Sequence, residues 1–174
     1  MKKLLLISYY WPPAGGGGVQ RWLKMSKYLN QFGWELVVVT PHKTDGTITD
    51  ESLEKEVRNE IEVLRTEIWE PYDLFKKFTG KKKDTKVYSG FIDENAKPSL
   101  TKKISVFIRG NFFIPDARMF WKKPAVQTIE NYLKTNKVDA VLSTGPPHTT
   151  HLIALKIKEK YNYPWVADFR DPWT

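Results

Sequence analysis

The first forty residues constrain the fold most, because two short apolar runs flank a glycine-rich loop and an amphipathic segment. Residues 4–8 and 35–40 are continuous apolar runs, the pattern of strands that are buried on both faces of a parallel sheet. Residues 9–18 hold two prolines and four glycines and predict a loop, and residues 19–32 carry apolar side chains at helical spacing. The region therefore predicts a strand–loop–helix–strand unit with a right-handed crossover.

The last third of the chain repeats this alternation of helix and strand. Apolar spacing predicts helices over 122–136 and 148–161, and short apolar runs predict strands over 139–143 and 165–168. Residues 61–64 add another short strand. The fold class that we expect is therefore α/β: a Rossmann-like open parallel sheet of about five strands, with helices on both faces.

Length and composition bound the organisation of the chain. With 174 residues, 41% of them hydrophobic, it suits one domain with a real core. We expect residues 1–174 to form a single Rossmann-like domain that is interrupted by a basic, partly helical insertion at about 72–113. The absence of cysteine excludes disulfides, thiolate zinc sites and a cysteine nucleophile, and it fits a reducing compartment. No apolar run is long enough to span a membrane.

The glycine-rich loop after the first predicted strand is the first candidate site. Gly15, Gly16, Gly17 and Gly18 lie directly before a predicted helix. Backbone without side chains lets N–H groups approach a ligand closely, and a helix N-terminus attracts anions. Arg21, in the first turn, adds a charged donor. Because the loop is neither a Walker A motif nor a dinucleotide fingerprint, we interpret it as a phosphate or pyrophosphate contact. The alternative is a flexible linker.

The loop after the fourth predicted strand is the second candidate. Ligands of open parallel sheets bind beyond the carboxyl ends of the strands, which makes Thr144 a candidate binding residue. His148 is a candidate catalytic residue, either for proton transfer or as a donor to an anion. We expect His151 to be a packed or exposed helix residue, and Thr149 or Thr150 to cap the helix. No third ligand accompanies the two histidines, so we expect no metal site.

Charged residues follow the last predicted strand. Arg170 stands between Asp168 and Asp171. Charge at the end of a buried strand is costly unless it is paired or used. We interpret Arg170 and Asp171 as the rim of a binding cleft that holds a polar ligand. The alternative is an internal ion-pair network.

The segment from Phe75 to Arg109 carries almost all of the excess positive charge. It has ten lysine and arginine residues against three acidic ones, a net charge of +7 in a chain whose total is +8. We expect its basic residues to bind an anionic membrane surface or an anionic acceptor. Single-stranded nucleic acid and plain solvation of a surface lobe are the alternatives. The residues that we assign to this role are Lys76, Lys77, Lys81, Lys82, Lys83, Lys102, Lys103 and Arg109.

Two blocks of sequence resemble one known family. Residues 9–40 are similar to the opening of family-four glycosyltransferases, which have the GT-B fold, and residues 139–173 are similar to the end of the N-terminal domain in that group. The RDPW sequence near the end resembles members that build surface polysaccharides. The two blocks make up 67 of the 174 residues, and the basic middle has no counterpart.

The resemblance implies a two-domain enzyme. The N-terminal domain of such enzymes mainly holds the acceptor, and the C-terminal domain holds the nucleotide-diphosphate sugar. Transfer retains the anomeric configuration and typically needs no bound metal, which leaves the nucleotide sugar as co-substrate and no other cofactor. By position, the four glycines approach the donor diphosphate or the acceptor, and Arg21 lies close behind. Many relatives have a histidine where this chain has Thr144, and His148 stands a few residues later.

We therefore expect the acceptor-side domain of a retaining glycosyltransferase that acts in surface polysaccharide synthesis. Its partners are a nucleotide sugar, a saccharide or lipid-linked acceptor, and an anionic membrane surface, with nucleic acid not expected. Its location is cytoplasmic, or peripheral on the inner face of the membrane. The C-terminal donor domain is absent from this chain, so we expect the fragment to be inactive alone. The alternatives are a non-catalytic nucleotide- or nucleic-acid-binding module, which predicts salt-sensitive binding of oligonucleotides, and a domain whose lysines dock a partner protein.

Overall fold

The structure of the chain is a computed structural model, which describes residues 1–44, 48–68 and 114–171. The basic insertion that we expect at about 72–113 lies outside the described residues. The eight basic residues assigned to a membrane or anionic acceptor therefore stay a prediction from the sequence.

Among the described residues, five parallel strands form one open sheet, which confirms the predicted fold class. The order across the sheet is β3-β2-β1-β4-β5, so the chain moves outward from β1 in one direction and then in the other. Each strand that sequence patterning predicted is present, within a few residues at its ends. The strands are β1 (Lys2–Ser8), β2 (Trp34–Pro41), β3 (Glu62–Thr66), β4 (Ala140–Gly145) and β5 (Trp165–Phe169).

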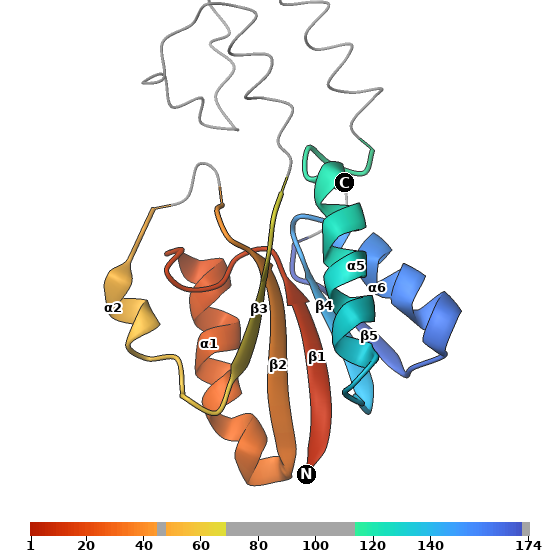
Figure 1. The fold of residues 1–174 in the computed structure, drawn as a ribbon. Coiled ribbons are helices and arrows are strands. Elements are labelled where there is room, and N and C mark those ends of the chain that lie inside the picture. The colour runs from red at the N-terminus through yellow and green to blue at the C-terminus, as the bar shows by residue number, and fades with distance from the viewer. Residues whose placement is uncertain (45–47, 69–113, 172–174) are drawn as a thin grey trace, which may run out of the picture.

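Helices cover the two faces of this sheet (Figure 1). Helix α1 and the short α2 lie on one side, while α5 and α6 lie side by side on the other. Single turns of 3₁₀ helix follow α1 (Asn30–Phe32) and precede α5 (Met119–Trp121). In the described part of the chain the α-helices are α1 (Gly17–Leu29), α2 (Glu51–Glu54), α5 (Lys122–Leu133) and α6 (Thr149–Tyr161).

Alternation along β1 divides the core into two layers. Leu4 and Leu6 face the α1 side and pack with Trp22 and Leu23, whereas Leu5 and Ile7 face the α5 and α6 side. Leu5, Leu6 and Ile7 have no exposed surface. Burying such side chains contributes about 1.5–3 kcal/mol each, which explains why the central strand reads as a continuous apolar run.

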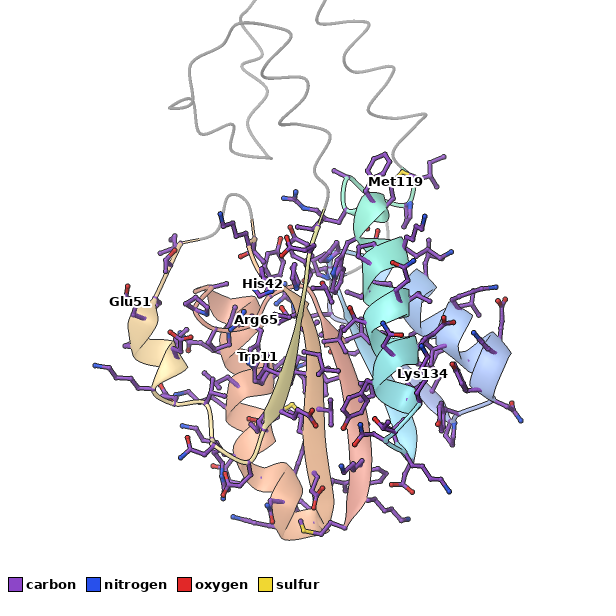
Figure 2. All side chains as sticks on the ribbon, in the orientation of Figure 1. Trp11, His42, Glu51, Arg65, Met119 and Lys134 are labelled. Carbon is purple, nitrogen blue, oxygen red and sulfur yellow. The ribbon has the colours of Figure 1, made fainter. Side chains whose placement is uncertain are left out.

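Residues in the left-handed conformation end two of the helical segments. Gly33 has φ 79° and ends the turn after α1, a left-handed conformation that glycine adopts without steric cost. Asn162 does the same after α6, with φ 55°. Figure 2 labels Met119, which begins the 3₁₀ turn before α5, and Lys134, which is the C-cap of α5. No helix in the described part of the chain is long and apolar enough to cross a membrane.

Candidate functional site

The glycine loop after β1 is held in place by the chain that follows β2. The N–H of Gly15 donates to the carbonyl of Ile48 at 2.6 Å, and the N–H of Asp50 donates to the carbonyl of Pro13 at 2.8 Å. Arg65 on β3, labelled in Figure 2, donates through Nη2 to the carbonyl of Pro12 at 2.6 Å. The loop is thus anchored from two sides, which disfavours the flexible-linker alternative. The Gly15 amide already has an acceptor, so it is not one of the donors open to a ligand.

The remaining glycines form the N-terminus of α1. Gly16 is the N-cap with φ 104°, a conformation that a side chain would strain, and the helix begins at Gly17. No side chain caps this end, and none of the described residues accepts a hydrogen bond from the N–H of Gly17 or Gly18. The first turn holds no acidic residue. This helix end therefore presents open donors and the positive end of the helix dipole.

Asp168, on β5, joins α1 to the ends of β4 and β5. Its Oδ2 accepts a hydrogen bond from the Thr144 hydroxyl at 2.9 Å and one from the indole N–H of Trp22 at 3.2 Å. Arg21 pairs with the same carboxylate, 3.1 Å from Nη1 to Oδ2. Two of the predicted site residues, Arg21 and Thr144, therefore meet at a carboxylate that sequence reasoning had noted only as a neighbour of Arg170. The charge of Arg21 is balanced there.

Arg170 lies against the first turn of α1. A Cβ built on Gly18 would overlap the guanidinium of Arg170, with Nη1 as its nearest atom. The side chain of Arg170 is 31% exposed, and its Nε lies 3.5 Å from Oδ1 of Asp171. Arg170 is thus not locked in an internal network with Asp168, which is the alternative that the sequence left open. Its charge stands beside the open amides of α1.

The N-terminus of α6 differs from that of α1, because a carboxylate already caps it. Oδ2 of Asp116 accepts from the N–H of Thr149 at 2.8 Å, and Oδ1 accepts from the Thr149 hydroxyl at 2.8 Å. The Thr150 hydroxyl instead bonds the carbonyls of Thr144 and Pro147. The expectation that Thr149 or Thr150 caps this helix is wrong: the N-cap is His148, and the cap comes from Asp116, 33 residues away.

His151 and His148 lie on the α6 side of the same sheet edge. His151 is 6% exposed, and its ring centroid is 4.2 Å from that of Phe169 and 5.6 Å from that of His148. Burial lowers the pKa of His151 to about 4, and the neighbouring His148 adds to this effect, so the ring is neutral at pH 7. His151 is therefore packed, as expected, but in contact with the candidate site.

The structure brings most of the predicted site residues to one edge of the sheet. Gly17, Gly18 and Arg170 gather on the α1 side, Arg21 and Thr144 meet at Asp168, and His148 lies on the α6 side. Asp116 and Asp168 were missed as organising residues, because their partners are distant in sequence. Within the described ranges, no group of three or more His, Asp or Glu side chains could hold a metal ion.

Comparisons with known proteins bear on the fold. No family model matches the chain, and no curated protein gives a significant match. The solved structure of UGT2 from Phytolacca americana without ligand aligns with a TM-score of 0.50 and 9% identity, over 96% of this chain and 29% of that chain. The structure of UGT2 complexed with UDP-2-fluoroglucose and pterostilbene aligns with a TM-score of 0.51 and 9% identity, over 96% of this chain and 30% of that one.

At this identity the likeness shows a shared fold. The Rossmann-like fold class expected from the sequence is confirmed, and the fold matches part of a protein that was solved with UDP-2-fluoroglucose. This chain spans less than a third of the length of the UGT2 chains. Membership of family four stays a prediction from the sequence.

Proposed function

We propose that this chain is the acceptor-side domain of a retaining glycosyltransferase. The enzyme would move a sugar from a nucleotide-diphosphate sugar to a saccharide or lipid-linked acceptor in surface polysaccharide synthesis. Two observations support the proposal: the sequence blocks at 9–40 and 139–173, and the fold shared with UGT2. A donor domain would complete the cleft, which agrees with the small share of UGT2 that this chain spans.

The observation that carries the proposal is that backbone N–H donors and a guanidinium lie next to each other at the N-terminus of α1. The free amides of Gly17 and Gly18 and the guanidinium of Arg170 come from α1 and from the end of β5, yet they adjoin each other. Asp168 balances Arg21, so Arg170 is the cation beside the helix end. Fixed donors of this kind suit the charge that develops on a leaving diphosphate.

Each of these groups has a distinct role in the proposed reaction. The α1 amides and Arg170 would bind phosphate oxygens of the nucleotide sugar and stabilise the leaving diphosphate, since they need no rearrangement when the charge appears. His148 would transfer a proton to or from the acceptor hydroxyl, or form a hydrogen bond with it. Asp171 would help to orient Arg170. No further cofactor takes part in this scheme.

The basic segment at 75–109 would determine where the proposed enzyme is located in the cell. Its lysines would hold the domain on the anionic inner face of a membrane, where lipid-linked acceptors are present. The protein would then act in the cytoplasm as a peripheral enzyme.

A ligand titration tests the function. In spectra of the ¹⁵N-labelled chain, UDP-glucose and UDP should shift the amides of Gly17 and Gly18 and the Nε of Arg170, while uridine should not. Spectra that do not respond to millimolar UDP-glucose, UDP or pyrophosphate would overturn the proposal. Binding of a short oligonucleotide, with a steep dependence on salt, would instead favour the nucleic-acid module.

A further inference from the structure

A chain of hydrogen bonds leads from β5 through β4 to His151. The indole N–H of Trp165 donates to Oγ of Ser143 at 2.9 Å, and Oγ of Ser143 lies 2.8 Å from Nδ1 of His151. Ser143 has no exposed surface, and among the described residues its hydroxyl has no other acceptor. The hydroxyl proton of Ser143 therefore points at Nδ1 of His151, because a hydroxyl that accepts from Trp165 still has one proton to donate.

These hydrogen bonds set the tautomer of His151. Nδ1 accepts from Ser143, so the ring proton of the neutral imidazole is on Nε2. The burial that lowers the pKa of His151 keeps the ring neutral at physiological pH, so Nε2 stays a donor. His151 is thus prepared to donate a hydrogen bond at Nε2 rather than to accept a proton there.

The prepared donor has no partner among the described residues. Nε2 of His151 is buried and makes no hydrogen bond there, and such a group is costly unless something satisfies it. It points at Gly145, the last residue of β4, where an added Cβ would lie 2.8 Å from Nε2. Glycine therefore lets Nε2 approach the end of β4, where a side chain would collide with it.

Phe169 packs against the rings of both histidines. Its ring lies 4.2 Å from that of His151 and 5.8 Å from that of His148, but Phe169 is 56% exposed. A side chain that exposed changes rotamer on the picosecond to nanosecond timescale, so a ligand at the sheet edge can displace it. The carboxyl end of β4 belongs to the same edge of the sheet, where Thr144 bonds Asp168 and Arg170 adjoins α1.

We propose that His151 is a ligand-binding residue, whose Nε2–H donates a hydrogen bond to an oxygen atom of the molecule that binds at this edge. This assignment rests on the proposed function and adds a named contact to it. The shared chemistry is an oxygen acceptor, which a phosphate or a sugar hydroxyl supplies. A neutral donor does not require a negative charge, so it can serve either oxygen.

The test combines a tautomer measurement with binding. Two-bond ¹H–¹⁵N spectra of the imidazoles should show His151 as the Nε2–H tautomer, and UDP-glucose should shift its Nε2 resonance. His151→Asn keeps an acceptor for the Ser143 hydroxyl but lacks the far edge of the ring, so the affinity for UDP-glucose should fall about tenfold. His42→Asn is the matched control, since His42 is exposed and lies after β2. Its affinity should equal that of the wild type.

The outcomes separate this assignment from the function that it rests on. Wild-type binding of UDP-glucose with an unchanged affinity in His151→Asn would overturn the role of His151 and leave the function intact. An Nδ1–H tautomer would also overturn it, whatever the binding result. A wild type that binds none of the probes would remove the proposed function, and the binding role with it. Pyrophosphate and free glucose, titrated separately, tell whether the acceptor is a phosphate or a sugar hydroxyl.

Discussion

The guanidinium of Arg170 occupies the space that a side chain on Gly18 would need. The contact joins the end of β5 to the first turn of α1, two segments that are about 150 residues apart in the chain. It depends on glycine at position 18 because of close approach, since Gly18 does not have a positive φ. Gly16 differs, because its φ of 104° requires glycine for backbone reasons.

Replacing Gly18 by alanine should separate binding from stability. The new Cβ would push the guanidinium of Arg170 away, so the affinity for UDP-glucose should fall several-fold. The melting temperature should stay the same or rise, because alanine favours a helix over glycine by about 1 kcal/mol. Gly17→Ala is the matched control, since nothing lies within 4 Å of its added Cβ. Equal affinities of the two variants in calorimetry would show that the position of Arg170 has no effect on binding.

Asp168→Asn should destabilise the domain more than Arg21→Ala does. The asparagine cannot replace all three acceptor contacts of a carboxylate that is 17% exposed, and we expect a loss of about 1–3 kcal/mol. Arg21, with a side chain 41% exposed, should cost less than about 1 kcal/mol. Urea unfolding of both variants measures the difference. The reverse order would mean that the ion pair, and not the bonds to Thr144 and Trp22, holds the cluster.

Asp116→Ala should loosen the start of α6. The variant loses the acceptor for the N–H and hydroxyl of Thr149, and losing a cap costs about 1 kcal/mol. Asp116→Asn keeps an acceptor oxygen and should lose only part of this. Hydrogen exchange of the amides at 149–151 should speed up most in the alanine variant and less in the asparagine variant. Unchanged exchange there would assign the cap a minor role.

The pH dependence of stability should contain a term from His151. Its pKa is about 4 in the folded state and near 6.5 when unfolded, so the unfolded chain binds a proton first as the pH falls. Stability from this group is therefore complete above about pH 7, is lost between about 6.5 and 4, and amounts to at most about 3 kcal/mol. His148, Asp116 and Asp168 also act on the charge of this ring, and all three are present in both proteins. The free energy of unfolding of wild type and of His151→Asn, measured in urea from pH 7 to 4, gives the contribution of His151 as the difference between the two proteins. A difference that does not change with pH would contradict this prediction.

Replacing Lys81, Lys82 and Lys83 with glutamate should reduce sedimentation with vesicles that contain anionic lipid. Three charge reversals remove a large part of the attraction to the surface, and the effect should shrink as salt rises. Neutral vesicles provide the control. Equal sedimentation of the variant and the wild type would favour the alternative, in which these lysines are only solvated.

The fold was predictable because its signals are local. Continuous apolar runs such as 4–8 and 35–40 identify strands buried on both faces, and the glycines and prolines after them identify loops. The carboxyl ends of parallel strands always meet at one edge, so sequence order alone placed Gly18, Thr144 and Arg170 near one another. What remained open was which of them touch.

Only the tertiary structure decided which charges cancel and which stay open. Asp168 neutralises Arg21 rather than Arg170, and Asp116 caps α6 from a segment 33 residues earlier. Neither pairing leaves a trace in the sequence, because each depends on distances of a few ångströms between residues that are far apart along the chain. The state of His151 has the same origin: the residue type permits a donor, an acceptor or a charge, and burial beside Ser143 and Trp165 selects the neutral donor.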